Sequence, residues 1–251
     1  MQILGIDIGG SGIKGALVET ESGSLVTARH RIPTPEGAKP QPVAQIVAEV
    51  VRHFDWHGPV GAGFPAIVHS GVVYSAANVS KKWIGVNAQA LLSDETGCPV
   101  IVMNDADAAG VAEMTFGAGR GHKGTVLIIT IGTGLGSALF TNGHLVPNTE
   151  FGHIEINGKD AELSASDAAR KRENLTWEKW TRRFNRYLLT MEALLSPDLI
   201  ILGGGASKEH ADFLPSLTPR CPVVPAQLLN EAGIVGAALT AEKRLVLGGE
   251  T

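Results

Sequence analysis

One strand-turn-strand pattern occurs twice in this sequence, and it constrains the fold more than any other feature. Ile6-Asp7-Ile8 leads into the turn Gly9-Gly10-Ser11-Gly12 and a second apolar run, and Ile129-Thr130-Ile131 leads into Gly132-Thr133-Gly134 and another. Glycine permits positive φ and a close approach of the backbone, and unpaired N–H groups in such turns bind phosphate oxygens. Either turn alone would be an ordinary β-hairpin. The repeat predicts two related halves that hold a nucleotide or polyphosphate between them.

Composition limits the remaining possibilities. The chain has 251 residues, of which 44% are hydrophobic and 18% charged, so it can bury the core of one large or two modest domains. Its formal charge of −4 argues against a dedicated nucleic-acid binder. No basic leader segment and no stretch of about 20 apolar residues is present, so we expect a cytoplasmic protein with no membrane partner. Cys98 and Cys221 lack zinc-site spacing, which predicts reduced thiols.

Strand and helix patterns alternate along the chain and predict an α/β fold with mixed sheets. The final helix can return to pack on the first half, so we expect an N-terminal lobe of residues 1–104 joined by a helix at 231–245. The second lobe is expected over 105–230, with a ligand cleft between the lobes. The predicted strands are 3–7, 12–18, 25–31, 60–64, 100–103, 125–131, 134–140 and 199–202, with helices at 43–54, from 106 to about 117, and from about 165.

Asn104-Asp105 follows a buried strand directly, at the carboxyl end where open α/β sheets place ligands. Phosphoryl transfer to an alcohol needs a carboxylate near the attacking hydroxyl, and most of the remaining catalysis is positioning and charge neutralisation. Asp105 is therefore the candidate general base, and Asn104 can bond neighbouring sugar hydroxyls. The alternative is that Asp105 only caps the helix that starts at Ala106.

A second polar constellation is Glu150-Phe151-Gly152-His153. A carboxylate and an imidazole held by a glycine turn can accept from and donate to adjacent hydroxyls of a pyranose, so the natural partner is a polyol. Glu155 and Glu162 follow closely, and either can add an acceptor. The alternative is that both groups are solvated or bonded locally.

Three further features suit a phosphate donor. Asp7 ends the first strand beside the first glycine turn, where an aspartate can hold magnesium directly or through water. Lys14 lies just beyond that turn and can neutralise phosphate, unless it is a solvated strand residue. Gly203-Gly204-Gly205 follows an apolar strand and can admit an adenine or ribose, although glycine-rich strand-to-helix turns are common.

A basic, amphipathic helical segment stands out in a chain that is acidic overall. Lys179, Arg182, Arg183 and Arg186 share one helical face opposite an apolar one, and Lys81-Lys82 forms another basic pair. Such a stripe is either a solvated face or a track for a long polyanion.

Taken in order, these motifs resemble the ROK family of sugar kinases within the actin-like ATPase superfamily, over essentially the whole chain. Further motifs are similar to those of the polyphosphate-using glucokinases of that family, including the polyphosphate/ATP glucomannokinases. They are Gly63-Phe-Pro65, Ser75-Ala-Ala-Asn78, Ser80-Lys-Lys-Trp-Ile-Gly85, Asn148-Thr-Glu-Phe-Gly-His153 and Asp160-Ala-Glu162.

The resemblance implies a two-lobed actin-like ATPase (ribonuclease H-like) fold and phosphorylation of glucose at its 6-hydroxyl by polyphosphate and ATP, with Asp105 as the base. It also implies magnesium near Asp7, a homodimer, and mannose as a further substrate to be tested. The sugar would be surrounded by Gly63, Asn78, Asn104, Glu150, His153 and Glu162. Phosphate contacts would come from Asp7, Gly9, Gly10, Ser11, Gly12, Lys14, Thr130, Gly132, Thr133, Gly134, Gly204 and Gly205.

One departure from the family pattern bears on metal content. Many ROK kinases carry a zinc-binding cysteine cluster after the histidine of the Glu-x-Gly-His motif, whereas no cysteine follows His153 here until Cys221. The short segment 158–162 replaces that cluster in the polyphosphate-using branch, so we expect no zinc.

Two other functions stay open at this stage. One is an ATP-dependent hexose kinase whose basic helix is only a solvated face. The other is a sugar-responsive regulator. The sequence disfavours it, because such a regulator would need an additional N-terminal segment, whereas the first phosphate hairpin begins at Ile3.

Overall fold

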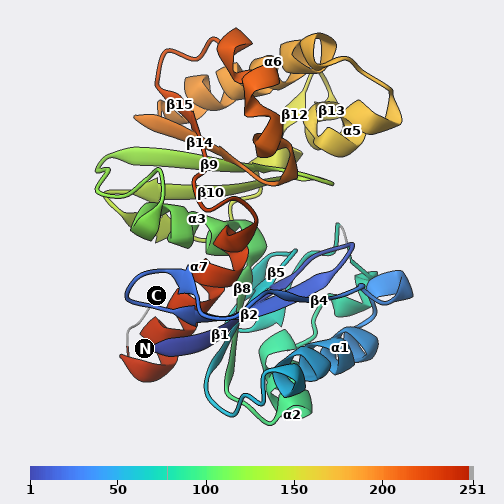
Figure 1. The fold of residues 1–251 in the computed structure, drawn as a ribbon. Coiled ribbons are helices and arrows are strands. Elements are labelled where there is room, and N and C mark those ends of the chain that lie inside the picture. Colours follow the sequence, from blue (N-terminus) through green and yellow to red (C-terminus); the bar gives the residue numbers. More distant parts are fainter. Residues whose placement is uncertain (78, 249–251) are drawn as a thin grey trace. The chain divides into compact units, whose positions relative to one another are not determined.

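A computed structural model describes residues 1–77 and 79–248 of the chain. The chain forms two compact units, and each is a mixed α/β structure with its own mixed sheet (Figure 1). Unit 1 contains residues 1–112 and 231–251, and unit 2 contains residues 113–230. The expectation of two lobes with mixed sheets is thus confirmed. Among the described residues, no helix is long and apolar enough to cross a membrane.

Unit 1 is organised around one sheet, with strand order β3-β2-β1-β5-β8 and β4 paired to β2. Strands β1, β5 and β8 are parallel, whereas β2 is antiparallel to its neighbours. Its elements are β1 (Gln2–Ile8), β2 (Ile13–Glu19), β3 (Ser24–Leu25), β4 (His30–Ile32), α1 (Pro40–His53), β5 (Val60–Phe64), β6 (Val68–His69), β7 (Val72–Val73), α2 (Ala88–Thr96), β8 (Val100–Asn104), the start of α3 (Asp105–Phe116) and α7 (Ala232–Ala241), with short 3-10 turns at Glu36–Ala38 and Lys81–Trp83.

Alternating side chains of unit 1 cover both faces of its sheet. Leu4, Ile6 and Ile8 of β1 point into a core shared with α1 and α2, whereas the odd positions face α7. A Cβ on Gly5 would lie 2.1 Å from the carbonyl oxygen of Ile234 in α7. Glycine is therefore required where this helix lies against the strands.

The predicted strand at 25–31 is wrong as a single element. The structure divides it into β3 and β4, and both pair with β2 at different registers, since Val18 lies opposite Leu25 and Lys14 lies opposite Arg31. Residues 26–29 between them are not in a strand. The apolar pattern of this stretch does not reveal the interruption.

Unit 2 repeats the sheet plan of unit 1, with strand order β11-β10-β9-β14-β15. The β9·β10 hairpin is antiparallel and β14 pairs with β9 in parallel, as β5 pairs with β1 in unit 1. Apolar residues of α6 bury one face of this sheet. The elements are β9 (Thr125–Ile131), β10 (Leu135–Thr141), β11 (His144–Val146), β12 (Glu155–Ile156), β13 (Lys159–Asp160), α4 (Glu162–Ala165), α5 (Asp167–Arg172), α6 (Trp177–Leu195), β14 (Leu199–Gly203) and β15 (Val223–Pro225), with 3-10 turns at Phe151–His153, Gly205–Asp212, Leu214–Ser216 and Leu229–Glu231.

Candidate active site

In the first glycine turn, residues 9–12, protein donors occupy the carbonyl groups of Gly9, Ser11 and Gly12. Gly9 N–H donates to Gly12 O at 3.1 Å, Thr34 Oγ1 donates to Gly9 O at 2.5 Å, and Arg31 donates to Ser11 O at 2.7 Å. Within residues 1–77 and 79–248, no acceptor is found for the backbone N–H groups of residues 10–12. A turn with occupied carbonyls and open N–H groups is suited to an anion.

Asp7 and Lys14 lie directly opposite each other on β1 and β2 and form an ion pair of 3.0 Å between Oδ2 and Nζ. Both side chains are partly exposed, so the pair is accessible to a ligand. Gly233 of α7 comes so close to Asp7 that a Cβ there would lie 3.4 Å from the carboxylate. In the described part of the chain, Asp7 Oδ1 has no protein donor. Magnesium is commonly held by one or two carboxylates together with substrate phosphates, so Asp7 fits such a site.

The second glycine turn, residues 132–134, follows the same plan in unit 2. Gly132 N–H donates to Gly134 O at 2.9 Å, and the Gly132 carbonyl accepts from Ala168 N–H at 3.2 Å. Thr130 lies opposite Gly203 across β9 and β14. Gly204 has φ +79°, and a Cβ on it would lie 2.5 Å from the Ile131 nitrogen, so only glycine fits there. The structure therefore brings Gly203 and Gly204 against the end of β9, next to the second glycine turn.

Asp105 is the first residue of α3, directly after β8. Asn104 caps this helix: its Oδ1 accepts from Ala106 N–H at 2.9 Å and from Asp107 N–H at 3.0 Å, while its Nδ2 donates to Ala66 O at 3.2 Å. Asn104 is buried and Asp105 half-buried. The capping role considered for Asp105 belongs mainly to Asn104, although Asp105 Oδ1 also accepts from Ala106 N–H at 2.8 Å. The helix can form without the full use of the Asp105 carboxylate.

Gly63 on β5 adjoins Asp105, since a Cβ on Gly63 would lie 3.5 Å from the Asp105 Cα. The absence of a side chain at Gly63 leaves room beside the candidate base. Asn78, the other sugar-binding residue expected in this half of the chain, lies outside the described residues.

In unit 2, His153 and Glu162 both contact Asp160, and Glu150 lies close enough to His153 and Glu162 to interact with their charges. His153 Nδ1 lies 2.8 Å from Asp160 Oδ2, and Asp160 Oδ1 accepts from Glu162 N–H at 2.8 Å. The Glu162 carboxylate also accepts from Leu135 N–H at 2.8 Å, and Leu135 directly follows the second glycine turn. Sequence reasoning gave Asp160 no role at the site. The sequence signal that could have located Asp160 is the Asn157-Gly158 pair. Both residues have positive φ and form the tight hairpin between β12 and β13, which brings Asp160 back toward His153.

The charges of this cluster act on one another. Burial raises the pKa of the Glu150 carboxyl, which the positive charge of His153 partly opposes and the negative charge of Glu162 reinforces. Burial alone would lower the pKa of His153, but the hydrogen bond to Asp160 and the negative charges of Glu162, Asp160 and Glu150 outweigh it and raise that pKa. These contacts stabilise the protonated imidazole more than in an ordinary histidine, and in that form Nδ1 donates to Asp160.

We expect the His153 imidazole to titrate above its ordinary pKa of 6.5. Replacement of Asp160 by asparagine should lower this pKa, because it removes a negative charge and weakens the hydrogen bond. The stabilisation that comes from a raised pKa is fully present below pH 6.5 and is lost as pH rises through the folded-state pKa. NMR titration of the imidazole in both proteins measures the difference, and the exposed Asp94→Asn in unit 1 is the charge control. An unchanged pKa in Asp160→Asn would contradict the assignment.

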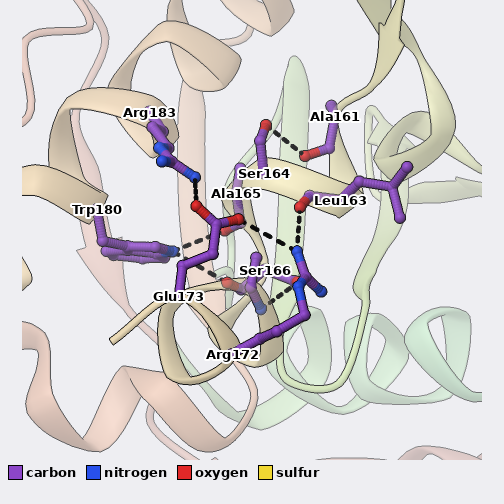
Figure 2. Close-up of polar contacts among 10 residues, drawn as sticks. Ala161, Leu163, Ser164, Ala165, Ser166, Arg172, Glu173, Trp180 and Arg183 are labelled. Atoms are coloured by element: carbon purple, nitrogen blue, oxygen red, sulfur yellow. Dashed lines mark hydrogen bonds and ion pairs between the residues drawn. The ribbon is translucent and has the colours of Figure 1, made fainter. Parts of the chain in front are cut away.

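A set of polar contacts holds the segment that carries Glu162 against α6 (Figure 2). The Trp180 indole N–H donates to Ala165 O and Ser166 O, at 3.1 Å each, and Arg172 donates to Leu163 O at 2.7 Å. Glu173 bridges Arg172 and Arg183, at 3.3 and 2.7 Å. Helices α4 and α5 are thus fixed to the first half of α6.

The predicted basic face does lie on α6, but ion pairs already use half of it. Arg182 pairs with Glu178, four residues earlier, and Arg183 pairs with Glu173. For Lys179 and Arg186, both exposed, the described chain provides no acidic partner. Lys81 and Lys82 are also exposed, in the short turn of unit 1 that the buried Trp83 anchors through a 2.9 Å bond to Ala38 O.

Among the described residues, no group of three or more His, Cys, Asp or Glu side chains could hold a metal ion.

The sequence profile of the ROK family matches residues 3–173, and the chain belongs to this family. It is 49% identical over 236 residues to polyphosphate glucokinase of Mycobacterium tuberculosis, covering 94% of this chain and 89% of that one. The inorganic polyphosphate/ATP-glucomannokinase of Arthrobacter sp. strain KM has a similar structure, with a TM-score of 0.95, 51% identity, and coverage of 97% of this chain and 99% of that one. A ROK family glucokinase from Streptomyces griseus, solved with glucose and AMPPNP, has a TM-score of 0.83 at 26% identity, with coverage of 96% and 99%.

Proposed function

We propose that this protein transfers the terminal phosphoryl group of inorganic polyphosphate, and of ATP, to the 6-hydroxyl of glucose. The observation that carries the proposal is the 49% identity to a polyphosphate glucokinase over 94% of the chain. The side chains support it, because the two units supply a candidate base, a cluster of groups suited to a polyol and two turns suited to anions. All are groups that phosphoryl transfer to a sugar requires.

In the proposed reaction, Asp105 accepts the proton of the 6-hydroxyl as its oxygen attacks the terminal phosphorus. A new O–P bond forms and the terminal phosphoanhydride bond breaks, which releases a polyphosphate shorter by one phosphate, or ADP. Glu150, His153, Glu162 and Asn104 hold sugar hydroxyls. Gly63, which has no side chain, leaves room for the sugar beside Asp105. The donor phosphates bind the two glycine turns.

Magnesium is proposed to bind near Asp7, where it would neutralise negative charge on the donor phosphates. Acceptance of mannose, a cytoplasmic location and a homodimer remain predictions. The name of the Arthrobacter enzyme, which includes both glucose and mannose, supports testing both sugars.

Formation of glucose 6-phosphate with magnesium tests the proposal, with long-chain polyphosphate or ATP as the sole donor in parallel reactions. Turnover with polyphosphate is the expected result. Turnover with ATP alone would restrict the protein to an ordinary hexose kinase, and no turnover with either donor and either sugar would contradict the proposal.

An ATP-dependent hexose kinase without polyphosphate use is the second candidate. It is favoured by the ion pairs of Arg182 and Arg183, which leave only part of the α6 basic face for a polyanion. The double variant Lys179→Gln/Arg186→Gln separates the two, because it removes two exposed charges without breaking an ion pair. If α6 binds polyphosphate, the KM for long-chain polyphosphate should rise about tenfold, while the KM for ATP should be unchanged. Equal effects on both donors, or no effect on either, would contradict polyphosphate binding by the basic face of α6.

A further inference from the structure

Three charged side chains lie in one row across the first hairpin of unit 1. Asp7 on β1 lies opposite Lys14 on β2, and Lys14 lies opposite Arg31 on β4. Directly opposite residues of antiparallel strands point to the same face of the sheet. The row therefore reads negative, positive, positive beside the first glycine turn, and sequence reasoning included only its first two members.

The charges of this row are unbalanced. Lys14 is neutralised by its 3.0 Å ion pair with Asp7, whereas no ion-pair partner for Arg31 lies within residues 1–77 and 79–248. The row Asp7, Lys14 and Arg31 therefore carries one unbalanced positive charge, on Arg31. An anion beside Arg31 would balance it.

The Arg31 guanidinium lies directly on the glycine turn. It donates to Ser11 O at 2.7 Å, and a Cβ on Gly12 would lie 2.6 to 2.8 Å from three of its atoms. The bond to Ser11 uses only part of the five-donor fork of an arginine. The remaining donors are available at the same turn whose backbone N–H groups are open. A guanidinium beside open amides matches the oxygens of a phosphate group better than an ammonium does.

We propose that Arg31 is a donor-binding residue, and that with Lys14 and the residue 9–12 turn it binds a phosphate group of a phosphoanhydride chain. This inference rests on the proposed function for the identity of the donor. The shared chemistry is a phosphoanhydride, which either polyphosphate or ATP can supply. A site that contacts only phosphate groups can bind polyphosphate, which has no nucleoside.

Arg31→Gln is the test variant, because glutamine is neutral and retains an N–H donor for Ser11 O. Calorimetry with tripolyphosphate, and separately with ATP, in the presence of magnesium measures donor binding without turnover. We expect the dissociation constant for tripolyphosphate to rise about tenfold, as for the loss of one charge-assisted hydrogen bond. An equal rise for ATP would show that both donors use Arg31, and a rise for tripolyphosphate alone would restrict this contact to polyphosphate. The matched control is Arg52→Gln, which removes an exposed arginine at the end of α1 in the same unit.

Thermal unfolding separates phosphate binding from a structural role. Without phosphate, the melting temperature of Arg31→Gln should equal or exceed that of the wild type, because Lys14 keeps its ion pair with Asp7 and glutamine can still donate to Ser11 O. Tripolyphosphate should raise the melting temperature of the wild type and of Arg52→Gln, and raise that of Arg31→Gln much less. A lowered melting temperature without phosphate, or unchanged tripolyphosphate binding, would overturn the proposal. A wild type that binds tripolyphosphate through Arg31 but forms no glucose 6-phosphate would contradict only the proposed function.

Discussion

Replacement of Asp105 by asparagine is expected to lower kcat roughly 10²-fold to 10⁴-fold, the usual contribution of a general base, with glucose affinity largely retained. Asparagine matches the shape of the aspartate but cannot accept the proton of the 6-hydroxyl. Asn104 supplies the main cap of α3, so the helix should form in the variant. Steady-state kinetics with saturating donor, combined with calorimetry of glucose binding, measures both quantities.

The control for Asp105→Asn is Asp94→Asn, which removes an exposed carboxylate in the same unit and should leave kcat unchanged. The melting temperature of Asp105→Asn should stay close to that of the wild type, because a carboxylate in the first turn of a helix stabilises it by only about 0.5 kcal/mol. Near-normal turnover in a folded Asp105→Asn protein would remove Asp105 from its role.

Truncation of Trp180 to alanine should destabilise unit 2 by about 3–5 kcal/mol, the range measured for large aromatic side chains in cores. The indole is fully buried, stacks on Phe184 at 4.8 Å, and donates to two carbonyl oxygens. Thermal unfolding should show a melting temperature lower by about 10 °C. The KM for glucose should also rise, since these bonds hold the segment that presents Glu162.

Two companion variants show which part of Trp180 matters. Trp180→Phe keeps an aromatic ring but loses the N–H, so it should cost about 1–3 kcal/mol, from the two carbonyl oxygens left without a donor. Trp177→Ala removes a partly exposed tryptophan of the same helix and should cost less than Trp180→Ala. If Trp180→Ala and Trp177→Ala are equally stable, the contacts in Figure 2 do not fix α4 and α5.

The main architecture could be predicted from the sequence because local patterns carry it. Buried-type apolar runs located β5 and β9 without error, and the paired hairpins predicted the repeated sheet plan. Helix α2 was missed, although Asn87 caps its start and Gly97 its end, because its nine residues have only a weak apolar stripe.

Features that depend on pairing between distant strands could not be predicted. Arg31 joins the first glycine turn only because β4 returns to β2 in one particular register, and nothing near Arg31 in the sequence encodes that register. Glu162 was predicted from its chemistry, but its bond to Leu135 N–H links residues 27 positions apart. The residue types were visible in the sequence, whereas their neighbours became visible only in the fold.

The discontinuity of unit 1 has a consequence for biosynthesis. Helix α7 covers a face of the sheet whose strands are synthesised more than a hundred residues earlier. Gly5 and Gly61 lack the side chains that would clash with this helix. Unit 2 is contiguous, so it can complete its core on the ribosome while the first sheet still has one face bare. A nascent chain that stalls before Glu231 would expose that apolar face and is expected to depend on chaperones until α7 emerges.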